Sequence, residues 1–129
     1  MNEIKLLLNG KMLNEDIIDW YASTVAVRLN VDRNKTRVVS AAASQMIMRG
    51  QPVRAQQQHL DTTEKKLVPW KTIFEFELLI YPVCWKAHWI IVALHPSQQL
   101  LCVFDSMQGN SEYPSEMAYT AMKQFDGYI

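Results

Sequence analysis

The sequence is poor in the features that mark several classes of protein. Its two cysteines, Cys84 and Cys102, have no second Cys or His at ligand spacing, so neither a disulfide framework nor a zinc site is indicated. We therefore expect reduced thiols, no metal and no cofactor. No apolar run approaches the ~20 residues of a membrane-spanning helix, and the N-terminus lacks the charged, apolar and small-residue order of a signal peptide.

An excess of one charge is also lacking. Basic and acidic residues number 13 each, which gives a formal net charge of +0. Proteins that bind nucleic acid or an anionic membrane surface carry an excess of Lys and Arg, because their ligands are polyanions. The composition therefore predicts a soluble intracellular protein whose partner is neither nucleic acid nor a membrane.

The length of 129 residues fits one domain with a single core, and no internal repeat divides the chain. We treat residues 1–129 as one module. Helical spacing of apolar residues predicts a first helix over 14–29, N-capped by Asn14. Its buried face is expected to comprise Ile17, Ile18, Tyr21, Val25 and Leu29. A second helix, closed by Gly50 in a left-handed cap, is predicted to bury Val38, Val39, Ala42, Ala43, Met46 and Ile47. The polar stretch 51–66 is expected to be a surface connection.

The apolar period changes after Leu67, where strands are expected. FEFELLIYPV at 74–83 predicts a strand that Pro82 ends or confines to an edge. KAHWIIVALHPSQQLLCVFDS at 86–106 predicts an antiparallel hairpin with a break at Pro96. A last helix is expected over 114–125, ending before Gly127. This order of elements predicts an α+β fold with antiparallel strand pairing.

An ionisable residue occupies each open end of the predicted hairpin. A break centred on Pro96 and Ser97 pairs His88 with Asp105, which predicts an imidazole nitrogen about 2.7 to 3.2 Å from a carboxylate oxygen. Both faces of the hairpin are apolar and are expected to be buried, the second carrying Trp89, Ile91, Ala93, Leu100, Cys102 and Phe104. Without further evidence, a solvated polar pair at two strand ends is the simpler interpretation.

Three stretches of the sequence resemble the ubiquitin-like-protein-specific cysteine proteases, the deSUMOylating enzymes related to the adenoviral processing protease. MLNEDIIDWY at 12–21 is similar to the family's opening helix, HWIIVAL at 88–94 to its HW strand, and VFDS at 103–106 to its DS strand end. The spacing between His88 and Asp105 also agrees. The resemblance implies a partial papain-like cysteine protease fold of N-terminal helices, an antiparallel sheet hairpin and a following helix.

The resemblance also implies roles for individual residues. His88 would be the general base for a cysteine thiol, and Asp105 would hold its imidazole in the productive tautomer. Trp89 would line the tunnel around the substrate's Gly-Gly tail, with a plain core aromatic as an equal alternative. Glu15 would face the ubiquitin-like partner, or else complement the helix dipole as a first-turn acid. Met12 stands where the family has its first tunnel Trp, which leaves the identity of the modifier open.

The family's nucleophilic Cys and oxyanion Gln follow the aspartate by more residues than this sequence contains. Cys84 is expected about 13 Å from His88 along an extended strand. Cys102 has the opposite parity to Asp105 and is expected on the other face of the sheet. Gln108 is interpreted as a turn residue. We therefore expect no nucleophile within the chain.

These inferences predict a fragment of a cysteine peptidase or isopeptidase domain that processes or removes SUMO-like or other ubiquitin-like modifiers in the nucleus or cytoplasm, and that is inactive as given. The alternative is a non-catalytic module that binds a ubiquitin-like protein or another protein. A third reading is a small globular protein with a chance HW/DS hairpin. Without the second half of such a domain, the apolar rows of the hairpin would lack cover, which predicts a homodimer or larger assembly.

Overall fold

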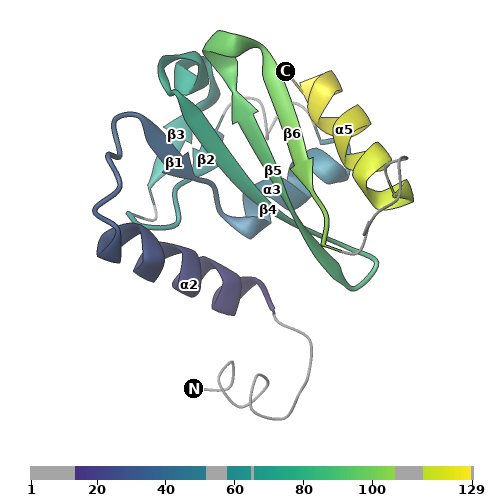
Figure 1. The fold of residues 1–129 in the computed structure, drawn as a ribbon, viewed down its shortest axis with the longest axis horizontal. Coiled ribbons are helices and arrows are strands. Elements are labelled where there is room, and N and C mark those ends of the chain that lie inside the picture. Colours follow the sequence, from purple (N-terminus) through teal and green to yellow (C-terminus); the bar gives the residue numbers. More distant parts are fainter. Residues whose placement is uncertain (1–13, 52–57, 65, 107–114, 129) are drawn as a thin grey trace.

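The structure is a computed structural model that describes residues 14–51, 58–64, 66–106 and 115–128. Its centre is a four-stranded sheet in the order β1-β4-β5-β6 (Figure 1). The bounds of these strands are Thr36–Val38, Leu78–Trp85, His88–His95 and Leu100–Phe104. β1 runs parallel to β4, and the other neighbours are antiparallel, so the sheet is mixed rather than wholly antiparallel as the sequence predicted. The α+β class is confirmed.

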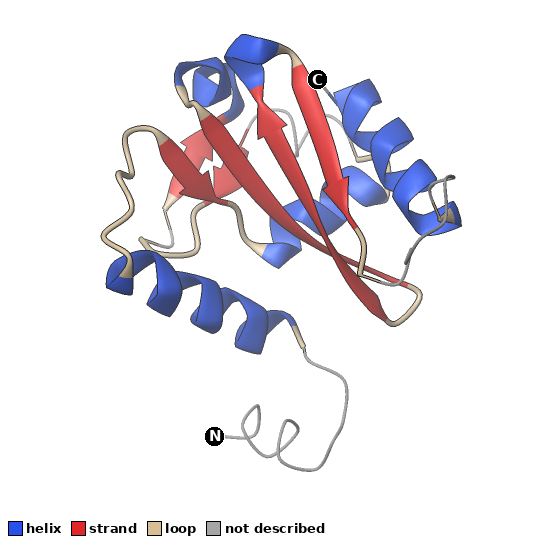
Figure 2. Cartoon of the chain, in the orientation of Figure 1, coloured by secondary structure: helices blue, strands red, loops and turns tan. Residues whose placement is uncertain are grey.

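The described residues include three α-helices beside the sheet (Figure 2), and their bounds are Glu15–Arg28 for α2, Ala41–Met48 for α3 and Glu116–Tyr128 for α5. α3 and α5 pack against each other and against the sheet, α3 on β4 and α5 on β6. Val38 and Val39 were predicted to lie on the buried face of this second helix, but Val38 belongs to β1 and α3 begins at Ala41. α5 continues through Gly127, where the sequence predicted its end. Among the helices of the described residues, none has the length and apolar content needed to cross a membrane.

Local capping residues explain where these helices begin and end. The Asn14 side chain accepts a hydrogen bond from the backbone N–H of Ile17 at 3.0 Å, as the sequence predicted. Ser40 caps α3 in the same way, accepting from the N–H of Ala43 at 3.2 Å. Gly50 has a φ of 67°, so the predicted left-handed cap is confirmed.

The buried face of α2 differs from the predicted one. Ile17 and Ala26 are its buried residues, whereas Tyr21 and Leu29 are exposed. Two polar contacts hold the helix: the N–H of Ala41 donates to Asp19 Oδ1 at 3.0 Å, and Ser23 Oγ donates to the carbonyl of Thr62 at 2.6 Å. The apolar periodicity misled the prediction because short polar side chains make these contacts.

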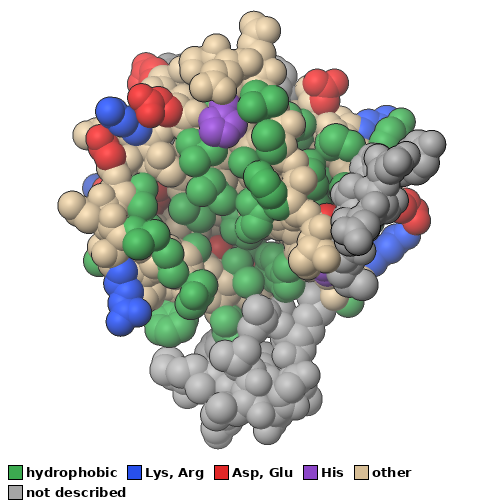
Figure 3. Space-filling view, in the orientation of Figure 1, with side chains coloured by type: hydrophobic (Ala, Val, Ile, Leu, Met, Phe, Trp, Pro, Cys, Tyr) green, Lys and Arg blue, Asp and Glu red, His purple; other side chains and the backbone are tan. Residues whose placement is uncertain are grey.

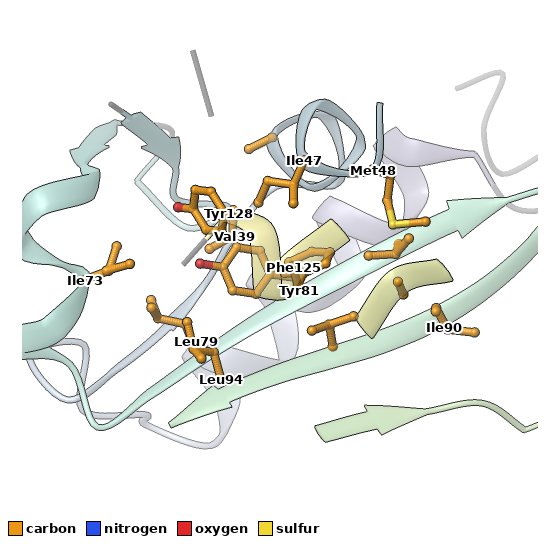
Figure 4. Packing of buried hydrophobic residues seen from close by; sticks show 14 of the residues in the cluster. Val39, Ile47, Met48, Ile73, Leu79, Tyr81, Ile90, Leu94, Phe125 and Tyr128 are labelled. Carbon is orange, nitrogen blue, oxygen red and sulfur yellow. The ribbon is translucent and has the colours of Figure 1, made fainter. Parts of the chain in front are cut away.

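The core lies between the sheet and the helices α3 and α5 (Figure 4). The rings of Tyr81 and Phe125 meet edge to face with centroids 5.0 Å apart, and Tyr128 packs on Phe125 at 6.4 Å. Burial raises the pKa of Tyr81 well above its usual value, and the interaction with Tyr128 raises it further. The core therefore keeps this phenol neutral.

β4 begins later and ends later than predicted. Residues Trp70–Glu75 form a 3₁₀-helix, η1, and the strand starts at Leu78. Pro82 lies inside β4, opposite Ile91, and does not end it. The strand tolerates a residue without an N–H because β1 pairs only as far as Ile80. Among the described residues, no other strand pairs with that side of β4 at Pro82.

Ahead of β4, the predicted surface connection 51–66 contains a short strand, β2 at Gln58–Leu60, which pairs antiparallel with β3 at Leu67–Pro69 directly after it. After β5, the chain turns through a short 3₁₀-helix, η2, at Pro96–Gln98, and Gln99 adopts a left-handed conformation with φ of 52°. The break around Pro96 is therefore confirmed. The predicted register is wrong by two residues, because Val92 rather than Ile90 lies opposite Val103.

The two faces of the β5–β6 hairpin differ in burial. Ile90, Val92 and Leu94 enter the core. On the other face, Ile91, Leu100 and Phe104 are 37%, 44% and 61% exposed, which contradicts the expected burial of both faces. Figure 3 shows hydrophobic side chains gathered over the sheet on this open face.

Candidate functional site

The ends of β5 and β6 bring together the two ionisable residues singled out in the sequence. His88 begins β5, and Asp105 directly follows β6. His88 Nε2 lies 2.7 Å from Asp105 Oδ1, so the predicted contact is confirmed. The imidazole is 24% exposed, whereas the carboxylate is 1% exposed. The aspartate is thus buried behind a histidine that reaches the surface.

This contact selects a tautomer of the neutral imidazole. A carboxylate only accepts hydrogen bonds, so Nε2 carries the proton that is donated to Asp105. Nδ1 then holds the basic lone pair. The pair therefore presents a ring nitrogen able to accept a proton, with a buried carboxylate on its opposite side to stabilise the imidazolium that forms.

Ser115 is a third member of this arrangement that the sequence analysis missed. Its Oγ donates to Asp105 Oδ2 at 2.5 Å and accepts from the N–H of Ala118 at 3.0 Å. Ser115 immediately precedes α5 and caps it. A capping serine was the available signal, but the predicted helix over 114–125 placed Ser115 inside the helix.

A tight turn sets the position of His88. β4 and β5 pair until Trp85 lies opposite His88, so only Lys86 and Ala87 remain to reverse the chain. Both have positive φ, 48° and 63°. This is the conformation of a type I′ hairpin turn, which usually contains Asn or Gly. The imidazole therefore projects from a short and rigid connection.

Two cavities flank the pair. One of about 610 Å³ opens on the exposed face of the sheet, where Ile18 of α2 approaches Trp89, Phe104 and Asp105. Another of about 480 Å³ lies beside Trp85, His88 and Ser115. Asp105 lines both cavities. The indole of Trp89 thus borders an open cavity next to the ionisable pair.

Comparison with known proteins identifies the family. The sequence profile of the Ulp1 protease family, C-terminal catalytic domain, matches residues 11–128. This chain belongs to the Ulp1 protease family. A comparison with curated proteins found no match.

A solved structure supports the fold. The catalytic domain of a Ulp1-like SUMO protease from Chaetomium thermophilum matches with a TM-score of 0.59 at 14% sequence identity. The match covers 92% of this chain and 47% of that chain, so this Ulp1-family chain spans about half the length of the domain it resembles. At this identity the likeness shows the fold, which is the partial protease-domain architecture that the sequence predicted.

Cys84 lies closer to His88 in this Ulp1-family chain than the sequence analysis expected. The distance of about 13 Å assumed an extended strand, but the chain reverses after Trp85, and Cys84 pairs with Trp89. A backbone group of His88 forms a hydrogen bond with the Cys84 thiol. The cross-strand partner of His88 is Trp85, so the Cys84 side chain leaves the sheet on the opposite face from the imidazole.

Glu15, the first residue of α2, lies near this thiol. Burial raises the pKa of Cys84, the Glu15 carboxylate raises it further, and the hydrogen bond from the backbone of His88 lowers it. The net effect is a raised pKa, which keeps the thiol protonated at neutral pH. Such a thiol is a poor nucleophile, because the thiolate is the attacking species.

Cys102 is the other cysteine of the chain, and it lies in β6. Cys102 pairs with Ala93 on the face opposite Val103, as its parity predicted. Met12 and Gln108 lie outside the described residues. Among the residues that the structure describes, no group of three or more His, Cys, Asp or Glu is arranged to hold a metal ion.

Proposed function

We propose that this chain supplies the general base and the orienting acid of a Ulp1-type cysteine peptidase domain that processes or removes SUMO-like or other ubiquitin-like modifiers. His88 is the base and Asp105 the acid. The observation that carries the proposal is the 2.7 Å contact between His88 Nε2 and a carboxylate that is 1% exposed. The nucleophilic Cys is proposed to come from outside these 129 residues, which makes the chain inactive as given.

The proposed chemistry uses the two sides of the imidazole separately. Nδ1 accepts the proton of the thiol, and the thiolate attacks the carbonyl carbon of the modifier's terminal glycine, whose bond to the amine nitrogen then breaks. Asp105 stabilises the imidazolium through the proton on Nε2. Nδ1 then returns its proton to the leaving amine, and water hydrolyses the thioester. No proton needs to pass to Asp105 in this scheme.

The cavity on the open face is the proposed binding site for the C-terminal tail of the modifier. Trp89, Ile18 and Phe104 line it with apolar surface. A flat indole against an aliphatic wall suits an extended Gly-Gly segment, because glycine has no Cβ to collide with either side. Glu15 is proposed to face the body of the modifier from the start of α2, and Met12 to take part in binding. Neither nucleic acid nor a membrane is proposed as a partner, and the proposed location is the nucleus or cytoplasm.

A non-catalytic module that binds a ubiquitin-like protein is the second candidate. The observation in its favour is the open apolar face, since monomeric proteins rarely expose large contiguous apolar patches. We also infer that two copies of this chain associate through the same face, where β6 is the edge strand of the sheet in the described part of the chain. Transcript sequence beyond the codon for Ile129 distinguishes peptidase from module: a Gln followed several residues later by Cys-Gly supports the peptidase, and a stop codon supports the module.

The test uses the 129-residue chain with SUMO. We expect no cleavage of a SUMO precursor and no labelling by a vinyl sulfone probe, because no thiol faces His88. We expect binding of mature SUMO, measured by calorimetry, to be lost in Trp89→Ala and with SUMO ending in Ala-Ala. Trp20→Ala is the control, since this exposed indole of α2 does not line the cavity.

Two results would contradict the proposal. Cleavage that disappears in Cys84→Ala or Cys102→Ala would show that a thiol of this chain is the nucleophile. Equal affinity of the chain for SUMO with Gly-Gly and with Ala-Ala tails would show that the cavity beside Trp89 does not distinguish the two tails. That result would favour the binding module.

A further inference from the structure

Both oxygens of the Asp105 carboxylate are engaged by side chains. Oδ1 meets Nε2 of His88 at 2.7 Å, and Oδ2 accepts from Ser115 Oγ at 2.5 Å. The second bond is short, as expected when a hydroxyl donates to an ionised acceptor. The carboxylate is therefore held from two directions.

The donor directions along this chain of hydrogen bonds are fixed. The N–H of Ala118 donates to Ser115 Oγ at 3.0 Å, so Oγ acts there as an acceptor. Its single proton remains for Asp105, which accepts without donating in return. The sequence of donation is Ala118 N–H to Ser115, Ser115 O–H to Asp105, and His88 Nε2–H to Asp105. Each group in this series therefore has a single role, as donor or acceptor, in each of its hydrogen bonds.

Rotation of the carboxylate is the motion that these bonds oppose. The terminal torsion of Asp has broad, roughly two-fold preferences, so a carboxylate held at one oxygen swings readily about its axis. A bond at the second oxygen fixes its plane. Ser115 is well placed to do so because α5 is anchored in the core through Ala118, Ala121 and Phe125. The Ser115 hydroxyl thus fixes the carboxylate of Asp105 relative to a rigid helix.

We propose that Ser115 is a positioning residue for the His88–Asp105 pair, through which the N-terminus of α5 sets the plane of the carboxylate and the tautomer of the imidazole. This inference rests on the proposed function, since it concerns how the base is kept ready. Ser115 takes no part in bond making or breaking, and the proton on its oxygen stays there.

The test is nitrogen-15 NMR of the histidine side chains in the 129-residue chain. The sequence has three histidines, and the His88→Gln variant assigns the signals of His88. In the unmodified chain we expect His88 as the Nε2–H tautomer, with an Nε2 proton signal that persists in water. Long-range correlations distinguish the two ring nitrogens directly.

Three variants separate positioning from helix capping. Ser115→Gly removes the donor, and glycine is well tolerated at a helix N-cap, so the fold is retained. We expect the Nε2 proton signal to be lost and the tautomers to mix. Ser115→Thr restores the hydroxyl and is expected to restore both. Ser40→Ala removes the matching cap of α3. The Ser40 hydroxyl contacts Ala43 and not Asp105, so this variant is expected to leave the tautomer of His88 unchanged.

The possible outcomes distinguish the positioning role from the proposed function. An Nε2 proton signal that survives Ser115→Gly overturns the role of Ser115, as does its equal loss in Ser40→Ala. Mixed tautomers in the unmodified chain overturn both the pair and the proposed function that depends on it. Failure of SUMO to bind, with the tautomer still responding to Ser115→Gly and Ser115→Thr, counts against the proposed substrate and leaves the positioning role supported.

Discussion

At the scale of single residues, Asp61 is a buried carboxylate that joins two segments of the chain. Arg33 donates to its Oδ1 at 3.0 Å, and Arg37 donates to its Oδ2 at 3.3 Å. The backbone N–H groups of Thr63 and Glu64 also donate to Oδ1, at 2.8 and 2.9 Å. The residues around β1 are thus tied to the turn that follows β2, through a side chain with full hydrogen-bond partners.

Removal of this carboxylate should be costly. Asp61→Ala leaves Arg33 and Arg37 without their buried partner, and we expect a loss of about 3 to 5 kcal/mol in the free energy of unfolding. Glu64→Ala is the matched control: it removes one ion pair to Arg33, at 2.9 Å on a partly exposed side chain, and should cost less than about 1 kcal/mol. Urea denaturation measures both, and equal small losses would show that Asp61 is not the centre of this network.

The contact between His88 and Asp105 was predictable although the register behind it was wrong. Strand side chains alternate with a period of two, so a slip of two residues leaves every side chain on its face. In the true register Phe104 lies opposite Ile91, which brings Asp105 beside Ile90 and one diagonal step from His88. Ser115 was not predictable in this way, because its contact depends on where α5 packs against the sheet.

At the scale of secondary structure, the turn between β4 and β5 holds two residues in a conformation that suits glycine. Lys86 and Ala87 have φ of 48° and 63°, directly before His88. The left-handed region costs a residue with a Cβ about 1 to 2 kcal/mol. The strand pairing on either side, from Leu79 to Trp85, supplies the energy that maintains the turn. Strain is thus stored next to the proposed base.

Relief of this strain should stabilise the chain. For Ala87→Gly, the strain removed exceeds the about 0.4 to 1 kcal/mol lost to the greater freedom of glycine when unfolded. We expect a net gain of about 0.5 to 1 kcal/mol in the free energy of unfolding. Ala42→Gly makes the same change at an exposed position of α3 and should cost about 1 kcal/mol. Thermal and urea unfolding compare the two, and a loss of stability in both would contradict the strained turn.

The two helix caps at Asn14 and Gly50 were predictable, whereas the buried face of α2 was not. Asn14 and Gly50 act through hydrogen bonds and φ angles within a few residues, so the sequence is sufficient to recognise them. The face that α2 buries depends on distant partners, Ala41 and Thr62, which no periodicity contains. Pro82 was misjudged for a related reason, since its tolerance depends on where the neighbouring strand β1 ends.

At the scale of the whole molecule, the open face of the sheet is the feature with the greatest consequence. Ile91 and Phe104 lie opposite each other on adjacent strands, and Leu100 lies further along β6 on the same face. β6 is also the edge of the sheet in the described part of the chain. An exposed apolar edge strand is a template for association with another chain. The sequence predicted that the apolar rows of the hairpin would lack cover but not which row, because the face that is covered depends on where the helices pack.

Association of two copies through this face is expected to depend on Phe104. In an isologous dimer each substitution occurs twice, and burial of one Phe contributes about 1.5 to 3 kcal/mol. Phe104→Glu should therefore weaken dimerisation by at least about 3 kcal/mol, or more than about a hundredfold in Kd. Tyr119→Glu changes an equally exposed aromatic residue on α5, away from this face, and should leave Kd unchanged. Sedimentation and light scattering over a dilution series measure the shift. The dimer would be ruled out if the chain stayed monomeric at every micromolar concentration and bound no hydrophobic dye. That result would show that the open face is stable in water.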